Sequence, residues 1–446
     1  MRIFLIFLLL LRKTITKHLK MLVKFTVGNY LSFKENVSID LNTSSLTELR
    51  SDNFLSTSVS NLSVLKSLVT YGSNSSGKSN LFKAIKFVKK FIQNSSKNSQ
   101  ANEEIDTEPF RLAIETINKP SFFEIEIVFD SARYRYGFEV DNKIVHKEWL
   151  FYAKKTKEYL LFKRDKQSLE VGNKFDKSSK NLITNTRENA LFLSVCAQFN
   201  IEIAKNIIKQ LSNLKYISGT NDRDTIDFTV KLLNDPNYSK IINNFIKGAN
   251  LGFNKIETEK IEITEDMLNK SGIPKDLHKM VLENNSQNTL ITTEHTVYDE
   301  KQEPQGSTYF DLIENESLGT RKLFSLAGPI IDAIINGRTL IIDEFDARLH
   351  PLLGKAIIKL FNSKENPKAQ LIIASHNSHF INSNSKLFRR DQIIIVEKDQ
   401  YGQTRMETLN DKKIRKDASF EKDYLAGKYD GVPIKLEINN QLNLFG

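Results

Sequence analysis

Eight consecutive residues of the chain have the types and spacing that hold a phosphate group. Residues 72–79 read GSNSSGKS, which matches G-x-x-x-x-G-K-[ST]. In such a loop the glycines let several backbone amides face one anion, the lysine reaches the β- and γ-phosphates, and the last hydroxyl binds Mg²⁺. The candidate residues for a nucleoside triphosphate are Gly72, Asn74, Ser75, Ser76, Gly77, Lys78, Ser79 and Asn80.

The segments on both sides of this loop favour phosphate binding over a chance Gly/Ser-rich turn. Residues 67–71 (SLVTY) have the pattern of a short apolar strand. Residues 81–92 place Leu81, Ile85 and Val88 at helical spacing, with lysines between them. Because a phosphate loop needs a strand before it and a helix after it, this context supports the motif.

A second candidate element is an apolar strand that ends in two acids. Residues 339–344 read TLIIDE, and a buried strand would carry Asp343 to its carboxyl end, beside the phosphate loop. There Asp343 could help to hold Mg²⁺, and Glu344 could orient or deprotonate an attacking water. The alternative is a pair of solvated acids at a strand end, which is common when such a strand stands alone.

Three further elements follow a particular order around the acidic strand. Residues 316–320 (ESLGT) open an amphipathic helix, residues 346–351 (DARLHP) follow the acids, and residues 371–376 form a strand that ends in His376. From the residues alone, Ser317 could be an ordinary helix N-cap and Asp346 a residue of a surface turn. A histidine at a strand end, such as His376, is usually packed or solvent-facing.

Composition limits the class of protein. The 446 residues are 40% hydrophobic and 26% charged, with a net charge of +10, which excludes a disordered tail and a polytopic membrane protein. The single cysteine, Cys196, excludes an internal disulfide and suits the cytoplasm. Residues 1–20 carry five basic residues, no acid and an apolar run shorter than the about 20 residues that span a bilayer. We expect them to be an extension upstream of a start at Met21, with an uncleaved anchor as the alternative, and no other segment suits a membrane.

The chain is predicted to be an α/β protein with an inserted subdomain. Residues 21–188 form an expected N-terminal lobe that holds the phosphate loop and three β-rich stretches, at 122–129, 134–140 and 144–152. Residues 189–288 have mainly helical periodicity and are read as a helical insert. Strand and helix alternate again in residues 289–446, which predicts a parallel C-terminal lobe.

Taken together, these motifs resemble ABC-type ATPase heads, and more narrowly the ABC-like ATPases of prokaryotic defence systems. The chain is similar to the Rlo-type ATPase subunit, the ATPase of the PARIS system and the ATPase domain of OLD-family proteins. The resemblance covers most of residues 21–433. It includes the opening MLVKFTVGNYLSFKENVSI, PFRL at 109–112, the strand pair FEIEIVF and YRYGFEV, the helix start ESLGTRKLF and the tail SFEKDYLAGKYDGVP.

The resemblance implies a P-loop fold of ABC-head type that binds ATP and Mg²⁺ between two subunits. It implies that Ser317 and Gly319 bind the γ-phosphate of the partner's nucleotide at a helix N-terminus, that Asp346 lies at the dimer interface and that His376 contacts the γ-phosphate. Two departures stand out. Residues 317–320 (SLGT) correspond to the signature sequence of ABC heads, and after the serine they have Leu-Gly-Thr where transporters have Gly-Gly-Gln. ABC heads also have a loop with a glutamine that reaches the metal, but neither Gln93 nor Gln100 follows a strand that would place it in such a loop.

Two functional hypotheses follow. The first is an ATP-hydrolysing sensor or motor of an anti-phage system, active as a homodimer or larger assembly, with a nuclease or toxin supplied by a protein encoded nearby. The 70 residues after His376 lack the acid arrangement of a two-metal nuclease, so none is expected in cis. The alternative is a DNA-repair or chromosome-associated head. A basic stretch at residues 154–166 favours DNA binding, but the absence of a long heptad array disfavours this class.

Overall fold

The computed structural model describes residues 20–57, 59–97, 103–261, 265–270, 274–283 and 288–431. Contacts between residues divide the chain into two compact units. The sheet unit comprises residues 20–220, 333–347 and 351–431, and the insert unit comprises residues 221–332 and 348–350. The domain boundaries at 188 and 288 stay a prediction, as does the role of residues 1–19, which lie outside the described residues.

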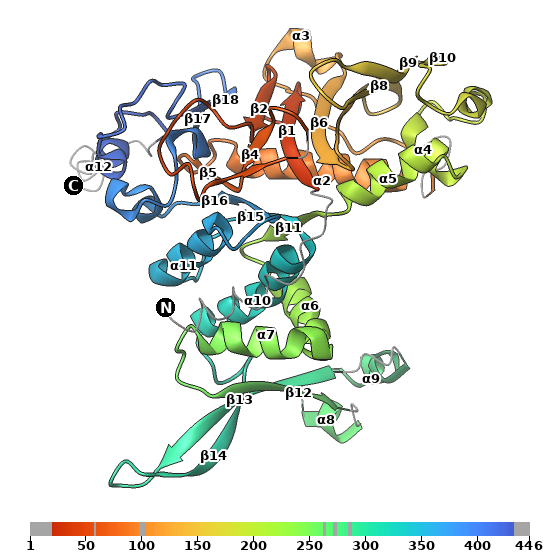
Figure 1. Cartoon of the computed structure of the whole chain (residues 1–446). Helices are drawn as coiled ribbons and strands as arrows, with labels where there is room; N and C mark the ends of the chain where they lie inside the picture. The colour runs from red at the N-terminus through yellow and green to blue at the C-terminus, as the bar shows by residue number, and fades with distance from the viewer. Residues whose placement is uncertain are drawn as a thin grey trace, which may run out of the picture. The chain divides into compact units, whose positions relative to one another are not determined.

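The sheet unit contains a seven-stranded antiparallel sheet with the strand order β10-β9-β8-β7-β6-β1-β2 (Figure 1). Its three central strands, β6, β7 and β8, confirm the three predicted β-rich stretches. Along much of each strand, buried side chains alternate with more exposed ones, as expected for a sheet with one face on the core. The strands are β1 (Met21–Gly28), β2 (Val37–Asp40), β6 (Ser121–Phe129), β7 (Ala132–Val140), β8 (Val145–Ala153), β9 (Tyr159–Asp165) and β10 (Ser168–Val171).

A second, six-stranded sheet of the same unit carries the predicted chemistry. Its order is β11-β15-β16-β5-β17-β18, and all neighbours are parallel except the last pair. Strands β5, β15 and β16 are buried along their whole length, which explains their continuous apolar sequences. The strands are β5 (Ser67–Tyr71), β11 (Leu214–Ser218), β15 (Thr339–Asp343), β16 (Gln370–Ala374), β17 (Ile393–Lys398) and β18 (Thr404–Thr408).

Helix α2 (Lys78–Asn94) joins the two sheets. It contains the predicted helix at 81–92 and contacts β1 of the first sheet as well as β11 and β15 of the second. Its apolar face, including Leu81, Ile85 and Val88, belongs to one buried cluster with side chains of both sheets. The other described strands and α-helices of this unit are β3 (Phe54–Ser56), β4 (Ser63–Leu65), α3 (Ile114–Ile117), α4 (Phe192–Gln198), α5 (Glu202–Leu211), α11 (Pro351–Asn362) and α12 (Phe420–Leu425).

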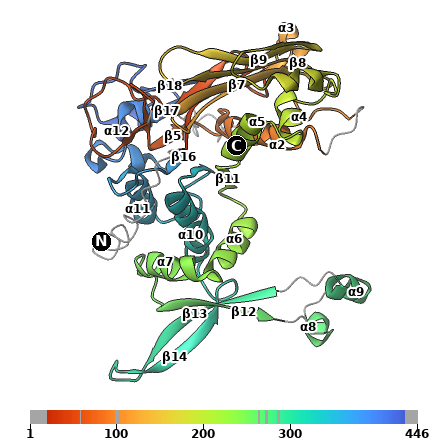
Figure 2. The same ribbon diagram turned by 45° about the vertical axis from the view of Figure 1, so that its right-hand side comes forward.

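The insert unit is a mixture of helices and an antiparallel sheet of three strands, in the order β12-β13-β14 (Figure 2). The range read as helical therefore also contains β11 and β12. Its elements are α6 (Arg223–Leu233), α7 (Pro236–Lys247), β12 (Lys255–Ile261), α8 (Glu265–Lys270), α9 (Lys275–Glu283), β13 (Asn288–Tyr298), β14 (Pro304–Asp311) and the start of α10 (Leu318–Asn336).

The expectation of parallel strands from residue 289 onward is wrong for β13 and β14, which pair as an antiparallel hairpin. The turn between them explains the difference. The Asp299 carboxylate accepts hydrogen bonds from the amides of Lys301 and Glu303, and Gln302 has a left-handed backbone with φ of 63°. Such a turn reverses the chain without a crossover helix, so parallel pairing begins only at β15.

Helix α10 contains Pro329 in its interior, and Thr229 on α6 contacts the turn that this proline interrupts. A proline cannot donate to the carbonyl four residues earlier, which here belongs to Ser325. The Thr229 hydroxyl accepts a hydrogen bond from the Gly328 amide at 3.1 Å, and its single proton faces the carbonyl oxygens of Thr225 at 2.9 Å and Ser325 at 3.2 Å. Thr229 is fully buried, and a Cβ on Gly328 would lie 2.6 Å from its hydroxyl oxygen.

We expect Thr229→Val to destabilise the insert unit, because valine keeps the shape but removes a buried hydroxyl that bonds backbone groups of α6 and α10. The expected loss in the free energy of unfolding is about 1–3 kcal/mol, measured by urea denaturation. Thr229→Ser keeps the hydroxyl and serves as the control. A valine variant within about 0.5 kcal/mol of the wild type would contradict this account of Pro329.

Candidate active site

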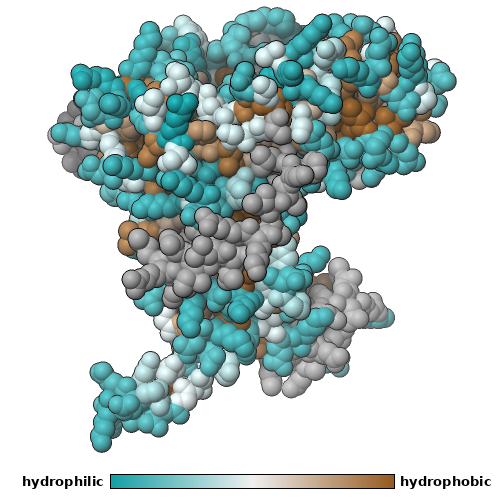
Figure 3. All heavy atoms as spheres, in the orientation of Figure 1, coloured by the Kyte–Doolittle hydropathy of each residue, from teal (hydrophilic) through white to brown (hydrophobic). Residues whose placement is uncertain are grey.

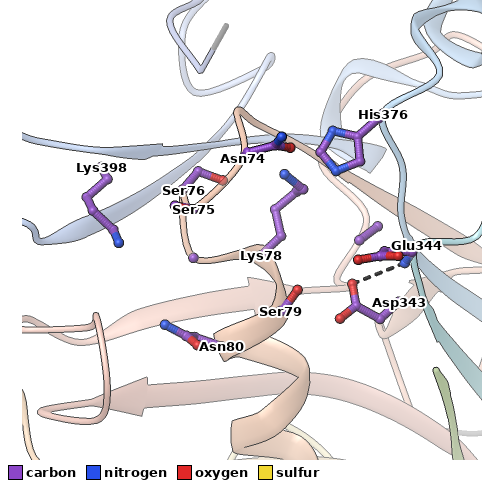
Figure 4. A pocket seen from close by; sticks show the side chains of 12 residues that line it. Asn74, Ser75, Ser76, Lys78, Ser79, Asn80, Asp343, Glu344, His376 and Lys398 are labelled. Atoms are coloured by element: carbon purple, nitrogen blue, oxygen red, sulfur yellow. Dashed lines mark hydrogen bonds between the residues drawn. The ribbon is translucent and has the colours of Figure 1, made fainter. Parts of the chain in front are cut away.

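The phosphate loop and the acidic strand meet at one cavity of about 510 Å³ at the carboxyl ends of the parallel strands (Figure 4). One strand, β16, lies between β5, which leads into the loop, and β15, which ends in Asp343. Ligands of open α/β sheets bind at this edge. The lining residues are Asn74, Ser75, Ser76, Gly77, Lys78, Ser79, Asn80, Asp343, Glu344, Ala374, His376 and Lys398.

The two glycines of the loop are needed for different physical reasons. Gly77 has φ of 109°, and a Cβ there would lie 2.2 Å from the Thr404 Oγ1. A Cβ on Gly72 would lie 2.2 Å from the Val396 carbonyl oxygen of β17. Only glycine lets the backbone of the loop come this close to β17. Ser75, with φ of 65°, adds a second left-handed residue to the turn. Alternating backbone geometry of this kind forms an anion-binding nest.

Lys78 is buried at the base of the loop. Its ammonium group donates to the carbonyl oxygens of Gly72 at 2.7 Å and Ser73 at 2.9 Å, which arches the side chain back over the loop. Burial lowers the pKa of Lys78 to about 8, although the nearby carboxylates of Asp343, Asp346 and Glu344 oppose the shift. An anion in the cavity would stabilise the charged form.

The loop also fits a polyanion by the chemistry of its donors. The Ser76 Oγ is buried and has no hydrogen-bond partner among the described residues. Lys78 uses two of its three donors on carbonyl groups, and the N-terminus of α2 contributes partial positive charge. These features suit the phosphate groups of a nucleotide.

The two acids at the end of β15 have different environments. Asp343 is buried, and its Oδ1 accepts a hydrogen bond from the Glu344 amide at 3.1 Å. In Figure 4 the Asp343 carboxylate and the Ser79 hydroxyl point toward each other, as ligands of one Mg²⁺ would. Glu344 is exposed to the cavity and has φ of 49°, a strained backbone for a glutamate. Strain of this kind often accompanies functional sites.

His376 lies at the rim of the cavity, directly after β16. Its amide donates to the Asp346 Oδ1 at 3.1 Å, so Asp346 fixes the backbone of the histidine. Partial burial and the positive charge of Lys78 lower the pKa of His376, which favours the neutral imidazole near pH 7. A neutral imidazole can donate one hydrogen bond and accept another.

Four of the candidate residues do not line this cavity. Gly72 shapes the loop from below, and Asp346 holds the backbone of His376. Ser317 and Gly319 belong to the insert unit. There the Ser317 Oγ accepts a hydrogen bond from the Thr320 amide at 3.1 Å, which is the N-cap contact that the sequence left open. This N-cap contact does not test whether Ser317 contributes to a nucleotide site, so that role stays a prediction.

Sequence reasoning missed Lys398 and Thr404. Lys398 ends β17 and lines the cavity, while the Thr404 hydroxyl donates to the Ser76 carbonyl at 2.8 Å and braces the loop. The apolar pattern of residues 393–396 could have predicted the position of Lys398. It indicates a buried parallel strand, and a cation at the carboxyl end of such a strand lies at this edge of the sheet. Of the two glutamines considered for the glutamine loop, Gln93 lies in the last turn of α2, and Gln100 lies outside the described residues.

Residues 419–431, the described part of the tail, pack against the start of the phosphate loop. The Tyr424 ring lies 5.6 Å from the ring of Tyr71, the last residue of β5. A Cβ on Gly431 would lie 3.5 Å from the Cα of Gly72, which shows how close the tail comes to the start of the loop. Tyr429 is buried as well, and its hydroxyl donates to Asp423. Both tyrosines therefore serve packing.

The fold and cavity define a P-loop NTPase of ABC-head type, with a β-rich N-terminal lobe, a parallel α/β lobe and an inserted subdomain. The chain belongs to the family described as "AAA domain, putative AbiEii toxin, Type IV TA system", which residues 69–382 match. These residues span the phosphate loop, the acidic strand and His376.

Comparison with solved structures gives matches at low identity. The "SMC head domain from Thermotoga maritima" matches with a TM-score of 0.40 and 13% identity, over 87% of this chain and 98% of that chain. A Smc head domain with an extended coiled coil, "bound to the C-terminal domain of ScpA derived from Pyrococcus furiosus", matches with a TM-score of 0.39 and 13% identity, over 92% and 99%. No curated protein gives a significant match. Among the described helices, none is both long enough and apolar enough to cross a bilayer.

Proposed function

We propose that this chain binds ATP with Mg²⁺ and hydrolyses it as an ABC-like head. The observation that supports this most strongly is the convergence of Lys78, Ser79, Asp343, Glu344 and His376 on one cavity. Residues far apart in sequence supply the cation, the metal ligands, the base and the γ-phosphate contact that phosphoryl transfer needs.

The phosphate loop would bind and orient the nucleotide. The backbone amides of the loop and the Lys78 ammonium would neutralise the β- and γ-phosphates. Ser79 and Asp343 would hold Mg²⁺, directly or through its water shell, and the metal would neutralise charge on the phosphate oxygens.

Glu344 and His376 would act on the attacking water and the γ-phosphate. The exposed carboxylate of Glu344 can accept a proton from a water molecule, whereas Asp343 is buried. The neutral imidazole of His376 can donate a hydrogen bond to a phosphate oxygen, and Asp346 holds its backbone in place. Lys398 would add positive charge at the opposite wall of the cavity.

Two subunits would complete the site. In the proposed homodimer, Ser317 and Gly319 at the start of α10 face the γ-phosphate held by the phosphate loop of the partner subunit. The first turn of α10 carries no acidic residue, so its N-terminal partial charge is not offset there. Asp346 would lie near the dimer interface.

The lowered pKa of Lys78 predicts how nucleotide binding depends on pH. Bound phosphates favour the charged ammonium, so binding above about pH 8 takes up a proton. Affinity is therefore full below pH 8 and falls above it, by up to about tenfold per pH unit. Titration with a fluorescent ATP analogue between pH 7 and pH 9.5 measures this. Lys78→Met should bind weakly and without this slope, and a flat wild-type profile would contradict the assignment.

The enzymatic proposal is tested with purified full-length protein. We expect Mg²⁺-dependent release of phosphate from ATP, and an ATP-dependent rise in mass to a dimer or larger assembly by light scattering. Protein that shows neither, alone or together with the protein encoded beside it, would contradict the proposal.

We further propose that the chain is the cytoplasmic sensor or motor of an anti-phage system, with a nuclease or toxin supplied in trans by a protein encoded nearby. The family description, which names a toxin of a toxin–antitoxin system, supports this class. Expression with the neighbouring gene should reduce phage plating, and a Lys78→Ala chain should not. Equal plating with the wild type and the variant would contradict the defence role.

A DNA-associated head is the second candidate, supported by the exposed lysines of the turn between β8 and β9, at Lys154, Lys155 and Lys157. Against it, the longest helix within the described ranges has 19 residues, too short for a coiled-coil arm. Strongly salt-dependent binding to duplex DNA, lost when these lysines are neutralised, would favour this candidate.

A further inference from the structure

Glu316 directly precedes Ser317, the serine of the signature sequence, and its side chain contacts the β13–β14 hairpin. The Glu316 Oε1 accepts a hydrogen bond from the Thr293 hydroxyl at 2.7 Å and lies 2.8 Å from the His295 Nε2. Thr293 is fully buried, and the side chains of His295 and Glu316 are only 21% and 10% exposed. Hydrogen bonds to a carboxylate in such a shielded place are among the stronger ones in proteins.

The backbone of Glu316 belongs to the turn that presents Ser317. Its carbonyl oxygen accepts a hydrogen bond from the Arg321 Nε at 3.0 Å. The Ser317 hydroxyl caps the amide of Thr320, and the Ser317 carbonyl accepts from the Arg321 amide. These local bonds fix the shape of the turn, whereas the Glu316 side chain connects it to another element of the insert unit.

His295 is held on β13 by aromatic neighbours. Its ring centroid lies 4.5 Å from that of Phe310 on β14 and 5.8 Å from that of Phe253, which precedes β12. The anchor therefore depends on the pairing of β13 with β14, where Thr293 lies opposite Phe310. A shift of the hairpin relative to α10 would move the donors of Glu316.

The anchor uses only the base of the hairpin, up to His295 on β13 and its partner Thr308 on β14. The pairing of β12 with β13 ends at Glu294, so from His295 onward the hairpin has two strands, and residues 297–306 form its outer end. Val297 and Tyr298 on this outer end are exposed. Figure 3 shows mainly polar residues over the end of the hairpin. The outer end can be altered without touching the anchor at Glu316.

We propose that the β13–β14 hairpin positions the signature turn, with Thr293 and His295 as positioning residues that act through Glu316. The inference rests on the proposed function, in which Ser317 contacts the nucleotide of the partner subunit. A displacement of about 1 Å in a group that must reach a phosphate can reduce turnover by up to about 100-fold. The anchor therefore affects hydrolysis and dimerisation on ATP, but not the first binding of nucleotide to the phosphate loop.

The test combines Thr293→Val and His295→Leu in the full-length chain, and follows turnover, nucleotide affinity and ATP-dependent dimerisation. We expect the turnover number to fall at least about tenfold while the Kd for the nucleotide changes less than about twofold. His295→Gln, alone, keeps an N–H donor near the position of Nε2 and should retain most of the turnover. Tyr298→Ser on the exposed outer end is the matched control and should behave like the wild type.

The possible results separate this inference from the proposed function. If the wild type neither hydrolyses ATP nor dimerises on it, the proposed function fails first. If the wild type does both, but the double variant keeps its turnover within about twofold, the positioning role is wrong. A parallel loss of nucleotide affinity, or a His295→Gln variant as slow as the double variant, would also overturn it.

Discussion

Glu344→Gln should reduce ATP turnover by about 100-fold or more while nucleotide binding persists. The amide keeps the size of the side chain but cannot accept a proton from the attacking water. Glu344 is the exposed acid of the pair at the end of β15, and its left-handed backbone directs it into the cavity beside His376. Because hydrolysis would no longer release the two subunits, we expect the variant to accumulate as an ATP-bound dimer.

Phosphate release and light scattering in the presence of ATP measure both effects on one sample. Glu170→Gln, which changes an exposed acid on β10, is the matched control and should turn over like the wild type. A Glu344→Gln protein that still hydrolyses ATP within about threefold of the wild type would remove Glu344 from the role of general base.

Lys78→Ala should abolish turnover and weaken ATP binding by about 10- to 100-fold. The lysine is the buried cation of the phosphate loop, and a charge-assisted hydrogen bond contributes about 1.5–3 kcal/mol. Its ammonium also bridges the carbonyls of Gly72 and Ser73, so the loop loses its internal brace. Equilibrium titration with a fluorescent nucleotide, together with phosphate release, measures the two losses.

Lys83→Ala provides the control for this substitution. Lys83 lies on the same helix, α2, but its side chain is exposed on the face away from the core. Removal of this charge should leave affinity and turnover unchanged. Similar losses in both variants would mean that general electrostatics of the helix, rather than the phosphate loop, governs nucleotide binding.

Local sequence patterns predicted the strands and the loop around the candidate site, because each of these elements is local in sequence. The strand at 67–71, the loop at 72–79 and the acidic strand at 339–344 each have a period or a motif within a few residues. Parallel strands bring their carboxyl ends to one edge, so the meeting of these segments followed from general rules of α/β folds. The burial of β5, β15 and β16 along their full length agrees with this reasoning.

The features that escaped prediction depend on contacts between distant residues. Nothing near Pro329 in sequence indicates that the Thr229 hydroxyl lies beside the Ser325 carbonyl, which the proline cannot bond. The antiparallel pairing of β13 and β14 depends on the turn around Asp299, whereas alternation of strand and helix suggested a parallel arrangement. The contact of Glu316 with His295 likewise required the fold. Side-chain partners that are far apart in sequence leave no periodic signal.

The central claim is that the phosphate loop of one subunit and the signature turn of the other form a single ATP site. Mixing Lys78→Ala protein with Ser317→Arg protein tests it most directly, because each is expected to be inactive alone. In a mixed dimer one of the two sites has an intact loop and an intact signature. Equal mixing should therefore restore roughly a quarter of wild-type turnover, since half of randomly assorted dimers are mixed and each has one intact site. A mixture as inactive as its components, although the mixed dimers form, would contradict the claim.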